Sequence, residues 1–598
     1  MEVTKLALVL ASASYVIGQV NPAAPPSILI DTSYQSPTGK STLLAPGSNL
    51  QAAINAASPG DELVLQAGGS WVGNFVLPAK ACPMVTIRTS ALSAFPAGVR
   101  ATPSQVGSMA SIVSASSAPA ISTAPGACGY QLVGLEVTVQ DGLGLNYGIV
   151  VLGGGSETSA NLPSSIFIER SWIHGKPTCD CKRGVQMNGK TQALVDSTVT
   201  DIHAQGIDSQ AVAGWAGPGP FKVFNNELQA GSEVVAFGGA RASIVGMIPS
   251  DIEIRQNHIT RPLSWMGAGW LVKNLFELKN AQRVLFDSNI AENNWYEAQD
   301  GYAILFQGFT ADSGDWAIVS DVTVTNNIIR HSANGFNFCG GCLASPTAPP
   351  GSKSTRIYVA NNLLDDIGNP TFTGNQTPDG VLIQILTNTA NLTMDHNTFV
   401  NFGGEATALL DGAPSPGVSL TSNILGFGTY GIYGNSVGSG LAAINQYLPG
   451  SVFAGNVLAV APPGISSYPA GNTFPSSWAA VQFLNFNKGN GGDYNLTAQS
   501  PYIAAGVAGS TPGANLTTIN ANTANVVPGS GPTIGTPLSC DLNNDGTVNV
   551  LDVQLATNQT LGYVGCGSAD LNGDGKCTVV DVQRIISTTL GAACRLGP

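Results

Sequence analysis

Residues 221–228, FKVFNNEL, and residues 251–259, DIEIRQNHI, carry the pattern that decides the fold of this chain. In each stretch apolar and polar residues alternate until a short polar corner that contains asparagine, after which apolar residues resume. Alternation with a period of two predicts a β-strand with one face turned inward. Asparagine tolerates the left-handed backbone that a tight corner demands. Each stretch therefore predicts a short strand that runs into a sharp turn.

The same pattern recurs along most of the chain. It is found again at 165–173 (SIFIERSWI), 193–199 (ALVDSTV), 284–290 (VLFDSNI), 322–329 (VTVTNNII), 356–364 (RIYVANNLL), 392–399 (LTMDHNTF) and 418–425 (VSLTSNIL). The corner positions, spaced 26 to 38 residues apart, are Ser171, Ser197, Asn226, Asn257, Asn289, Asn327, Asn362, Asn397 and Asn423. Such periods indicate stacked supersecondary units, and stacked Asn amides can hydrogen-bond along the stack. We interpret these residues as architecture and not as chemistry.

This repeat resembles the right-handed parallel β-helix superfamily typified by pectate lyases. The resemblance implies a mainly β solenoid over residues 20–523, with an amphipathic cap at 49–78 that protects the first edge. It also implies a functional site in a groove on one outer face. A linker rich in Gly, Pro, Thr and Asn is expected at 524–539.

Two twelve-residue stretches near the C-terminus share a second pattern, DLNNDGTVNVLD at 541–552 and DLNGDGKCTVVD at 570–581. Both have oxygen-bearing residues at positions 1, 3, 5, 9 and 12 and glycine at position 6, the spacing that a calcium loop requires. The predicted calcium ligands, with position 7 acting through its carbonyl, are Asp541, Asn543, Asp545, Thr547, Asn549, Asp552, Asp570, Asn572, Asp574, Lys576, Thr578 and Asp581. Two bound calcium ions are therefore expected.

An apolar-periodic run long enough for a short helix follows each loop, and prolines before the first loop exclude an entering helix. Together with Asp at position 12, this arrangement resembles the type I dockerin family and implies a small α-helical, EF-hand-like module at 540–598. The resemblance also implies a cohesin-like partner, contacted by positions 10 and 11 of each loop. Those positions hold Val550, Leu551, Val579 and Val580, which are more apolar than the familiar Ser/Thr type. A calcium-stabilised tail without a partner is the alternative.

The composition of the chain and its N-terminal segment indicate where the protein is located and which binding partners are excluded. The net charge is −13 and the pI is near 4.7, which argues against nucleic acid and would require local cations or calcium to receive an anionic polysaccharide. Residues 1–19 fit a secretory signal peptide, so the mature protein is expected to be extracellular. No later apolar run is long enough to span a membrane.

Ten cysteines, an even count, fit an oxidising compartment. Within the C-terminal module, a Cys540–Cys594 bond would join the two ends, although three pairings of its four cysteines are possible. Cys82 and Cys128 each precede a strand-like run and could form a bridge. Two closely spaced pairs, Cys179 with Cys181 and Cys339 with Cys342, form either disulfides, which we favour, or a zinc site.

Charged residues make up only 10% of the chain, so groups of them are conspicuous. In residues 270–280, WLVKNLFELKN, Phe276 and Leu278 are expected to point inward, which leaves Glu277 and Lys279 on the outer face. Two further acidic residues lie in earlier coils, 25 residues apart. The predicted catalytic set is Asp208, Glu233, Glu277 and Lys279.

Two mechanisms could use this set. Eliminative cleavage of a uronate polymer requires a base, for which Lys279 or Arg283 is a candidate, with acidic residues holding calcium. Hydrolysis requires two carboxyl groups, for example Asp208 with Glu233 or Glu277. A third interpretation is a solvated face of mutually paired charges. The histidines mostly flank the corner positions and are interpreted as corner residues, not ligands.

The sequence thus predicts a secreted carbohydrate-active β-helix protein in two parts: a solenoid that degrades a polysaccharide and a calcium-dependent module that attaches it to a partner. Because dockerins typically accompany such catalytic modules, either a lyase or a glycoside hydrolase is expected. The alternative is a non-catalytic, polysaccharide-binding or cell-surface structural protein, which the low charge and the absence of lyase or polygalacturonase signatures favour.

Overall fold

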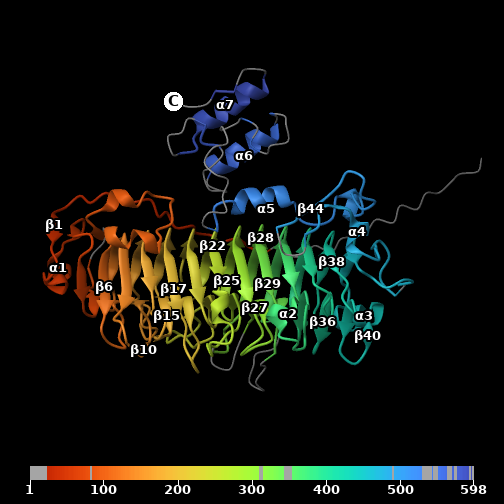
Figure 1. The fold of residues 1–598 in the computed structure, drawn as a ribbon, viewed down its shortest axis with the longest axis horizontal. Helices are drawn as coiled ribbons and strands as arrows, with labels where there is room; N and C mark the ends of the chain where they lie inside the picture. The colour runs from red at the N-terminus through yellow and green to blue at the C-terminus, as the bar shows by residue number, and fades with distance from the viewer. Residues whose placement is uncertain are drawn as a thin grey trace, which may run out of the picture.

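A computed structural model describes residues 23–80, 84–308, 314–342, 353–465, 467–487 and 491–527 of the chain. In the C-terminal module it describes residues 540, 542, 548, 550–561, 569–571, 576–590 and 594–595. The main body is a solenoid of three long parallel sheets, stacked coil upon coil along the horizontal axis of Figure 1. The predicted mainly β, parallel β-helix is therefore confirmed. The predicted signal peptide at 1–19 lies outside the described residues.

Each coil contributes one strand to each sheet, and the coil runs from sheet C to sheet A to sheet B. Sheet A contains β1 (Ser41–Leu44), β2 (Glu62–Leu65), β5 (Val85–Thr89), β8 (Cys128–Val133), β12 (Ser164–Glu169), β16 (Lys190–Val195), β19 (Phe221–Phe224), β22 (Ser250–Arg255), β25 (Ala281–Asp287), β28 (Val319–Thr325), β31 (Ser354–Ala360), β34 (Ala390–Asp395), β37 (Ser419–Thr421) and β41 (Val452–Ala454). Sheet B contains β3 (Ser70–Val72), β6 (Ala110–Ser114), β9 (Leu135–Val139), β13 (Trp172–His174), β17 (Thr198–Ile202), β20 (Glu227–Ala230), β23 (His258–Thr260), β26 (Ile290–Asn294), β29 (Ile328–Ser332), β32 (Leu363–Ile367), β35 (Thr398–Asn401), β38 (Ile424–Gly426) and β42 (Val457–Ala459).

Sheet C carries the face that matters most for function. It contains β4 (Phe75–Leu77), β7 (Ile121–Thr123), β11 (Val150–Leu152), β15 (Arg183–Met187), β18 (Gln210–Gly214), β21 (Val235–Phe237), β24 (Phe276–Leu278), β27 (Tyr302–Gln307), β30 (Asn334–Cys339), β33 (Ile383–Leu386), β36 (Ala408–Asp411), β39 (Ile432–Gly434) and the antiparallel β40 (Gly438–Ser439). Two small pairs lie outside these sheets, β10 (Leu145–Asn146) with β14 (Asp180–Cys181), and β43 (Phe483–Asn485) with β44 (Asp493–Leu496).

Helices are few and short. They are α1 (Leu50–Ala56), α2 (Pro370–Thr373), α3 (Leu441–Tyr447), α4 (Trp478–Val481), α5 (Leu516–Thr523), α6 (Val550–Thr560) and α7 (Val579–Thr589), with single 3₁₀ turns at η1 (Leu92–Ala94), η2 (Pro103–Ser108), η3 (Leu263–Trp265) and η4 (Val507–Gly509). Helix α1 packs Leu50 and Ile54 into the end of the solenoid core, as expected of a cap. None of the helices in the described part of the chain is long and apolar enough to cross a membrane.

The corner positions form a continuous buried ladder between sheets A and B. The side-chain oxygen of Asn289 accepts from both the backbone N–H and the side-chain amide of Asn257, at 2.9 and 3.0 Å. The same bonds repeat from Asn226 to Asn472, two steps beyond the predicted column. Because each amide satisfies a backbone group that would otherwise be unpaired in the core, Asn is required at this position in coil after coil.

The backbone reason given for these asparagines is wrong. The residue with positive φ at each corner is the one before the ladder, for example Gln256 at 53° and Ser288 at 57°, and not the ladder Asn itself. The left-handed position accepts several residue types, including Arg170 and His396. Hydrogen bonding along the stack, not backbone conformation, therefore accounts for the repeated asparagine.

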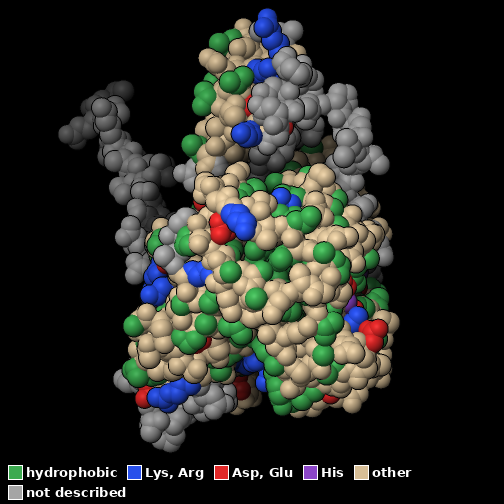
Figure 2. Space-filling view, turned by 90° about the vertical axis from the view of Figure 1, so that its left-hand side faces the viewer, with side chains coloured by type: hydrophobic (Ala, Val, Ile, Leu, Met, Phe, Trp, Pro, Cys, Tyr) green, Lys and Arg blue, Asp and Glu red, His purple; other side chains and the backbone are tan. Residues whose placement is uncertain are grey.

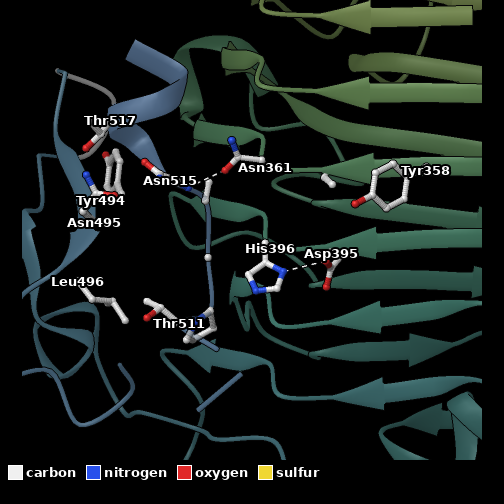
Figure 3. Close-up of a pocket in the computed structure, with 14 residues that line it drawn as sticks. Tyr358, Asn361, Asp395, His396, Tyr494, Asn495, Leu496, Thr511, Asn515 and Thr517 are labelled. Atoms are coloured by element: carbon white, nitrogen blue, oxygen red, sulfur yellow. Dashed lines mark hydrogen bonds and ion pairs between the residues drawn. The ribbon is translucent and has the colours of Figure 1, made fainter. Parts of the chain in front are cut away.

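Residues after the last coil fold back along the solenoid. β44 and α5 lie on the upper side of Figure 1, whereas β15, β27 and β36 of sheet C lie on the lower side. Leu516, Ile519 and Val526 of this C-terminal extension pack on the outer face of sheet B against Ile290 and other strand residues. Between the extension and the edge of sheet A lies a cavity (Figure 3). Seen along the axis from the N-terminal end, the described surface carries few charged side chains (Figure 2).

Candidate active site

Consecutive strands of sheet C bring the four predicted catalytic residues into one cluster. Val212, Val235 and Phe276 pair across β18, β21 and β24 and point into the core. The register places Glu277 on the opposite, outer face. Asp208 precedes β18, Glu233 precedes β21 and Lys279 follows β24, so three successive coils contribute to the cluster.

Lysines join the acidic residues of this cluster. Lys279 Nζ lies 2.8 Å from Glu277 Oε1. Lys273 Nζ lies 2.6 Å from Asp208 Oδ2 and 3.4 Å from Glu233 Oε1. Lys273 was not among the predicted catalytic residues, although it stands in the same WLVKNLFELKN stretch, four residues before Glu277. Its position close to Glu277 in the sequence was the observation from which Lys273 could have been predicted.

Exposure falls from the rim of the cluster to its floor. The side chain of Asp208 is 41% exposed, those of Lys273 and Lys279 are 17% and 19% exposed, and those of Glu233 and Glu277 are 3% and 5% exposed. The two glutamates are therefore shielded from water while Asp208 meets solvent. The charges are mutually paired, as the third interpretation of the sequence expected, but only Asp208 among the carboxylates is well exposed to solvent.

The two buried glutamates differ in their surroundings. Burial, followed by the nearby charge of Glu233, raises the pKa of Glu277 to about 7 against the opposing effect of Lys279. Glu233 accepts a hydrogen bond of 2.7 Å from Gln210 in addition to its contact with Lys273. Burial would lower the pKa of Lys273, but Glu233 and Asp208 outweigh it and raise that pKa. Near neutral pH the cluster therefore holds a carboxyl group poised between its two protonation states.

Several buried polar atoms of sheet C have no hydrogen-bond partner. Within the described residues, six buried side-chain atoms on or beside the strands of sheet C have no hydrogen-bond partner: Arg183 Nε, Gln210 Oε1, Asn274 Oδ1, Glu277 Oε2, Tyr302 OH and Gln307 Nε2. Buried polar groups are nearly always paired, because leaving one unpaired costs about 1–3 kcal/mol. Six further atoms of this kind lie elsewhere in the described residues, among them Arg170 Nε and Glu253 Oε2, so such atoms are not confined to sheet C.

Basic and aromatic side chains flank the cluster. The guanidinium of Arg183 lies 4.8 Å from the ring centre of Trp215, and burial lowers the pKa of Arg183. His203 stacks on Trp270 with 3.9 Å between the ring centres. Arg261 lies fully buried beneath the cluster and donates to the carbonyls of Gly231 and Asn274. Flat aromatic rings beside charged groups suit the binding of sugar rings and their acidic substituents.

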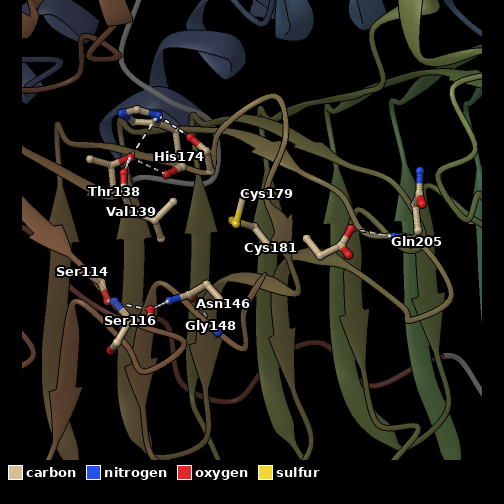
Figure 4. The surroundings of a disulfide bond; sticks show 12 residues. Ser114, Ser116, Thr138, Val139, Asn146, Gly148, His174, Cys179, Cys181 and Gln205 are labelled. Carbon is tan, nitrogen blue, oxygen red and sulfur yellow. Dashed lines mark hydrogen bonds between the residues drawn. A yellow bond between two sulfur atoms is a disulfide. The ribbon is translucent and has the colours of Figure 1, made fainter. Parts of the chain in front are cut away.

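A disulfide holds the strand that leads to Arg183 (Figure 4). Cys179 and Cys181 are bonded to each other, and the N–H of Cys181 donates to the His203 carbonyl at 2.8 Å. Asp180, between them, accepts from the backbone N–H of Gln205. Lys182 and Arg183 follow directly, so the bond fixes the point at which they enter the sheet.

The remaining cysteines follow the predicted preference for disulfides. Cys339 is bonded to Cys342, and Cys540 is bonded to Cys594 at the two ends of the C-terminal module. These bonds, with that of Cys179 and Cys181, rule out the zinc alternative. Cys128 is disulfide-bonded, whereas Cys82 lies outside the described residues.

Two observations bear on the eliminative hypothesis. Arg283 lies on β25 of sheet A, where it binds Asp251 at 2.7 and 2.8 Å, so it cannot act as a base at the sheet C cluster. In the part of the chain that the structure describes, no three His, Cys, Asp or Glu side chains are grouped to hold a metal. At the cluster, Lys273 and Lys279 lie beside the carboxylates.

The C-terminal calcium loops fall mainly outside the described residues, as do Asp541, Asn543, Asp545, Thr547, Asn549, Asn572 and Asp574. Asp552 and Asp581, at position 12 of each loop, are fully buried. Each accepts from the backbone N–H of position 2 in its own loop, at 2.7 Å from Leu542 and 3.0 Å from Leu571. Two buried carboxylates in equivalent places, among oxygen-bearing residues, fit a hard cation such as calcium.

Comparison with known proteins gives one family assignment, and it covers the C-terminal module alone. Residues 539–589 match the Dockerin type I domain family, whose members bind calcium. No curated protein matches the chain in sequence. The chain is therefore a parallel β-helix protein that carries a dockerin type I domain at its C-terminus.

Several solved structures resemble the solenoid at low identity. An alginate lyase from Paenibacillus sp. str. FPU-7 is 13% identical, with a TM-score of 0.26, over 67% of this chain and 97% of that one. A PL6 family alginate lyase is 13% identical, with a TM-score of 0.43, over 77% and 57%. A mannuronic acid specific family 6 lyase from the human gut microbiota is 12% identical, with a TM-score of 0.41, over 73% and 91%. None of these likenesses assigns an activity to this chain.

Proposed function

We propose that this protein is an extracellular enzyme that cleaves an acidic polysaccharide at the sheet C cluster. The observation that carries the proposal is Glu277: its side chain is only 5% exposed, its pKa is raised to about 7, and its Oε2 has no hydrogen-bond partner among the described residues. A carboxyl group kept partly protonated at neutral pH can donate a proton to a leaving oxygen.

Glu277 and Glu233 divide the acid and base roles in this proposal. Glu277 donates a proton to the glycosidic oxygen. Glu233, in contact with Lys273 and Gln210, acts as the base toward water or as the nucleophile. Lys279, 2.8 Å from Glu277, stabilises the carboxylate that remains after proton transfer. The predicted roles of these residues thus centre on the two glutamates, and hydrolysis is the favoured reaction.

The cations of the cluster support an acidic substrate. Lys182, Arg183, Lys273 and Lys279 converge near three acidic residues, in a chain with only 24 lysines and arginines and a net charge of −13. Such a local excess of positive charge would attract and orient uronate carboxylates that the protein as a whole repels. The same cations favour elimination as a second candidate, because it requires neutralisation of the uronate carboxylate.

The dockerin domain provides attachment in this proposal. Val550, Val579 and Val580, at the predicted partner-contact positions, are 74%, 71% and 50% exposed. Apolar side chains exposed at the start of α6 and of α7 offer a surface for a cohesin-like partner. Asp541, Asn543, Asp545, Asn549 and Asp552 in the first loop, with their counterparts in the second, would hold the two calcium ions.

A panel of acidic and neutral polysaccharides tests this function. Products are scored for new reducing ends, which either reaction creates, and for unsaturated, ultraviolet-absorbing ends, which elimination alone creates. We expect new reducing ends from a uronate-containing polymer and a loss of turnover in the Glu277→Gln variant. Retained binding without any product would favour the non-catalytic alternative. Full turnover in both Glu277→Gln and Glu233→Gln would place the reaction elsewhere.

A further inference from the structure

A cavity lies on the other side of the solenoid from the sheet C cluster. It has a volume of about 590 Å³ and lies between the edge of sheet A and the C-terminal extension (Figure 3). Tyr358 and Asp395 line it from β31 and β34, and Thr517 lines it from α5. In Figure 1 β44 and α5 occupy the upper side, whereas β15 and β27 of sheet C occupy the lower side. A ligand here would not reach the catalytic cluster.

Hydrogen bonds fix the two walls of this cavity. The backbone N–H of Asn515 donates to Asn361 Oδ1 at 2.6 Å, and that of Ala514 donates to Thr398 Oγ1 at 2.9 Å. Gly513, with φ of +89°, lies so close to Ile424 that a Cβ would be 2.7 Å from its Cδ1. The extension is therefore seated on the coils by specific contacts, and the cavity is part of the folded structure.

Few charged side chains line the cavity, and the carboxylate among them is already hydrogen-bonded. No Lys or Arg is among its lining residues. The single carboxylate, Asp395, accepts from Thr421 Oγ1 at 2.6 Å and lies 2.8 Å from His396 Nδ1. Burial would raise the pKa of Asp395, but these hydrogen bonds outweigh it and lower that pKa. The cavity therefore offers no free cation for an anionic ligand and no free carboxylate for a cationic one.

The groups that remain free are those that bind sugars. Tyr358 and Thr517 are among the lining residues, and within the described residues their hydroxyls have no hydrogen-bond partner. An aromatic ring can stack on the apolar face of a sugar ring, while hydroxyl and amide groups exchange hydrogen bonds with its rim. The volume falls within the roughly 300–1,000 Å³ typical of small-molecule sites.

We propose that this cavity binds a neutral oligosaccharide, independently of the cleavage site. The two sites differ in the chemistry they select: the sheet C cluster attracts acidic sugar units through its cations, whereas the cavity accepts uncharged, hydroxyl-rich ones. Binding here would hold the protein on a mixed polysaccharide material while the other face acts on the acidic chains. The proposal does not depend on the reaction at Glu277.

Titration of the full-length protein with cellotetraose, xylotetraose and mannotetraose tests the proposal, with tetragalacturonate as the acidic comparison. The Glu277→Gln variant is used so that cleavage cannot confuse the measurement, and binding is followed by calorimetry and by saturation-transfer NMR. We expect at least one neutral tetrasaccharide to bind. Thr517→Trp, which fills the mouth, and Tyr358→Ala, which removes the ring, should each weaken that binding by about tenfold.

Thr518→Trp provides the matched control, because Thr518 is exposed on the same helix but does not line the cavity. It should leave the affinity unchanged. Thr517 is also exposed, so its variant folds even if Tyr358→Ala does not. Absence of binding by all three neutral tetrasaccharides, or binding that survives Thr517→Trp, would overturn the proposal. Tighter binding of tetragalacturonate that Thr517→Trp abolishes would also overturn it.

Discussion

Two outer faces of the solenoid bury charged side chains, and they do so in opposite ways. On sheet B, His258 lies 2.7 Å from Glu227 and 2.9 Å from Glu292. Arg100 and Arg330 extend this row at its two ends, 3.5 Å from Glu227 and 2.5 Å from Glu292. Acidic and basic groups alternate, and none of the five has an unpaired buried side-chain atom within the described residues.

On sheet C the pairing is incomplete. Glu277 Oε2 and the nearby atoms of Asn274 and Gln210 have no partner in the described part of the chain. The pKa values differ accordingly: paired charges hold the pKa of Glu292 at about 2, against the effect of burial, whereas burial raises that of Glu277 to about 7. The comparison teaches that burial alone does not mark a functional charge. Glu277 differs from the paired charges of sheet B in that burial raises its pKa and its Oε2 has no hydrogen-bond partner within the described residues.

The largest expected effect separates the two faces by activity. Glu277→Gln keeps the shape of the side chain but removes the proton that the proposed reaction transfers, so turnover should fall by about 10²–10⁴-fold. The free energy of unfolding at pH 8 should stay constant or rise, because the substitution removes a carboxylate that is costly to bury ionised. Initial rates on the polymer identified by the panel, together with urea unfolding, provide the measurement.

His258→Gln should have the complementary result. It leaves Glu227 and Glu292 facing each other without the cation between them, which should cost about 3–5 kcal/mol of unfolding free energy. Turnover of the protein that remains folded should be unchanged, because His258 lies on sheet B, away from the cluster. Urea unfolding and initial rates at a temperature where the variant is folded measure both quantities. A stable but inactive variant would contradict the assignment of the two faces.

The free energy of unfolding should depend on pH over a different range for each of the two faces. The pKa of His258 is raised from 6.5 to about 9, so its stabilising contribution is complete below about pH 6.5 and is lost as pH rises toward 9. The pKa of Glu277 is raised from 4.5 to about 7, so stability falls as pH rises from 4.5 to 7, and the proton needed for catalysis is lost above 7. Unfolding free energies between pH 4 and 9 should show both windows. His258→Gln should remove only the upper one, and Glu277→Gln only the lower one.

The parts of the molecule that repeat could be predicted from the sequence, because each coil places the same residue type at the same point. Asn257 and Asn289 contact each other directly, so their spacing alone revealed the ladder. The outward placement of Glu277 followed from alternation along one strand.

Contacts made by irregular loops could not be predicted in this way. Lys273 meets Asp208 across 65 residues, and the contact depends on how the loops before β18 and β24 are folded. The bond between Asn361 and Asn515, which helps to build the cavity beside α5, spans 154 residues and joins the solenoid to its C-terminal extension. No period in the sequence relates such positions, since each loop has its own length and composition.

The smallest expected effect concerns the rim of the cluster. Asp208→Asn removes a carboxylate that is 41% exposed, so stability should change by less than about 1 kcal/mol. Because Lys273 would then be held by Glu233 alone, more of its charge becomes available to an acidic substrate. KM for that substrate should fall modestly while kcat changes little, and initial rates across substrate concentrations measure the two separately. A loss of kcat as large as that of Glu277→Gln would instead place Asp208 among the reacting groups, and the division between rim and floor would then be wrong.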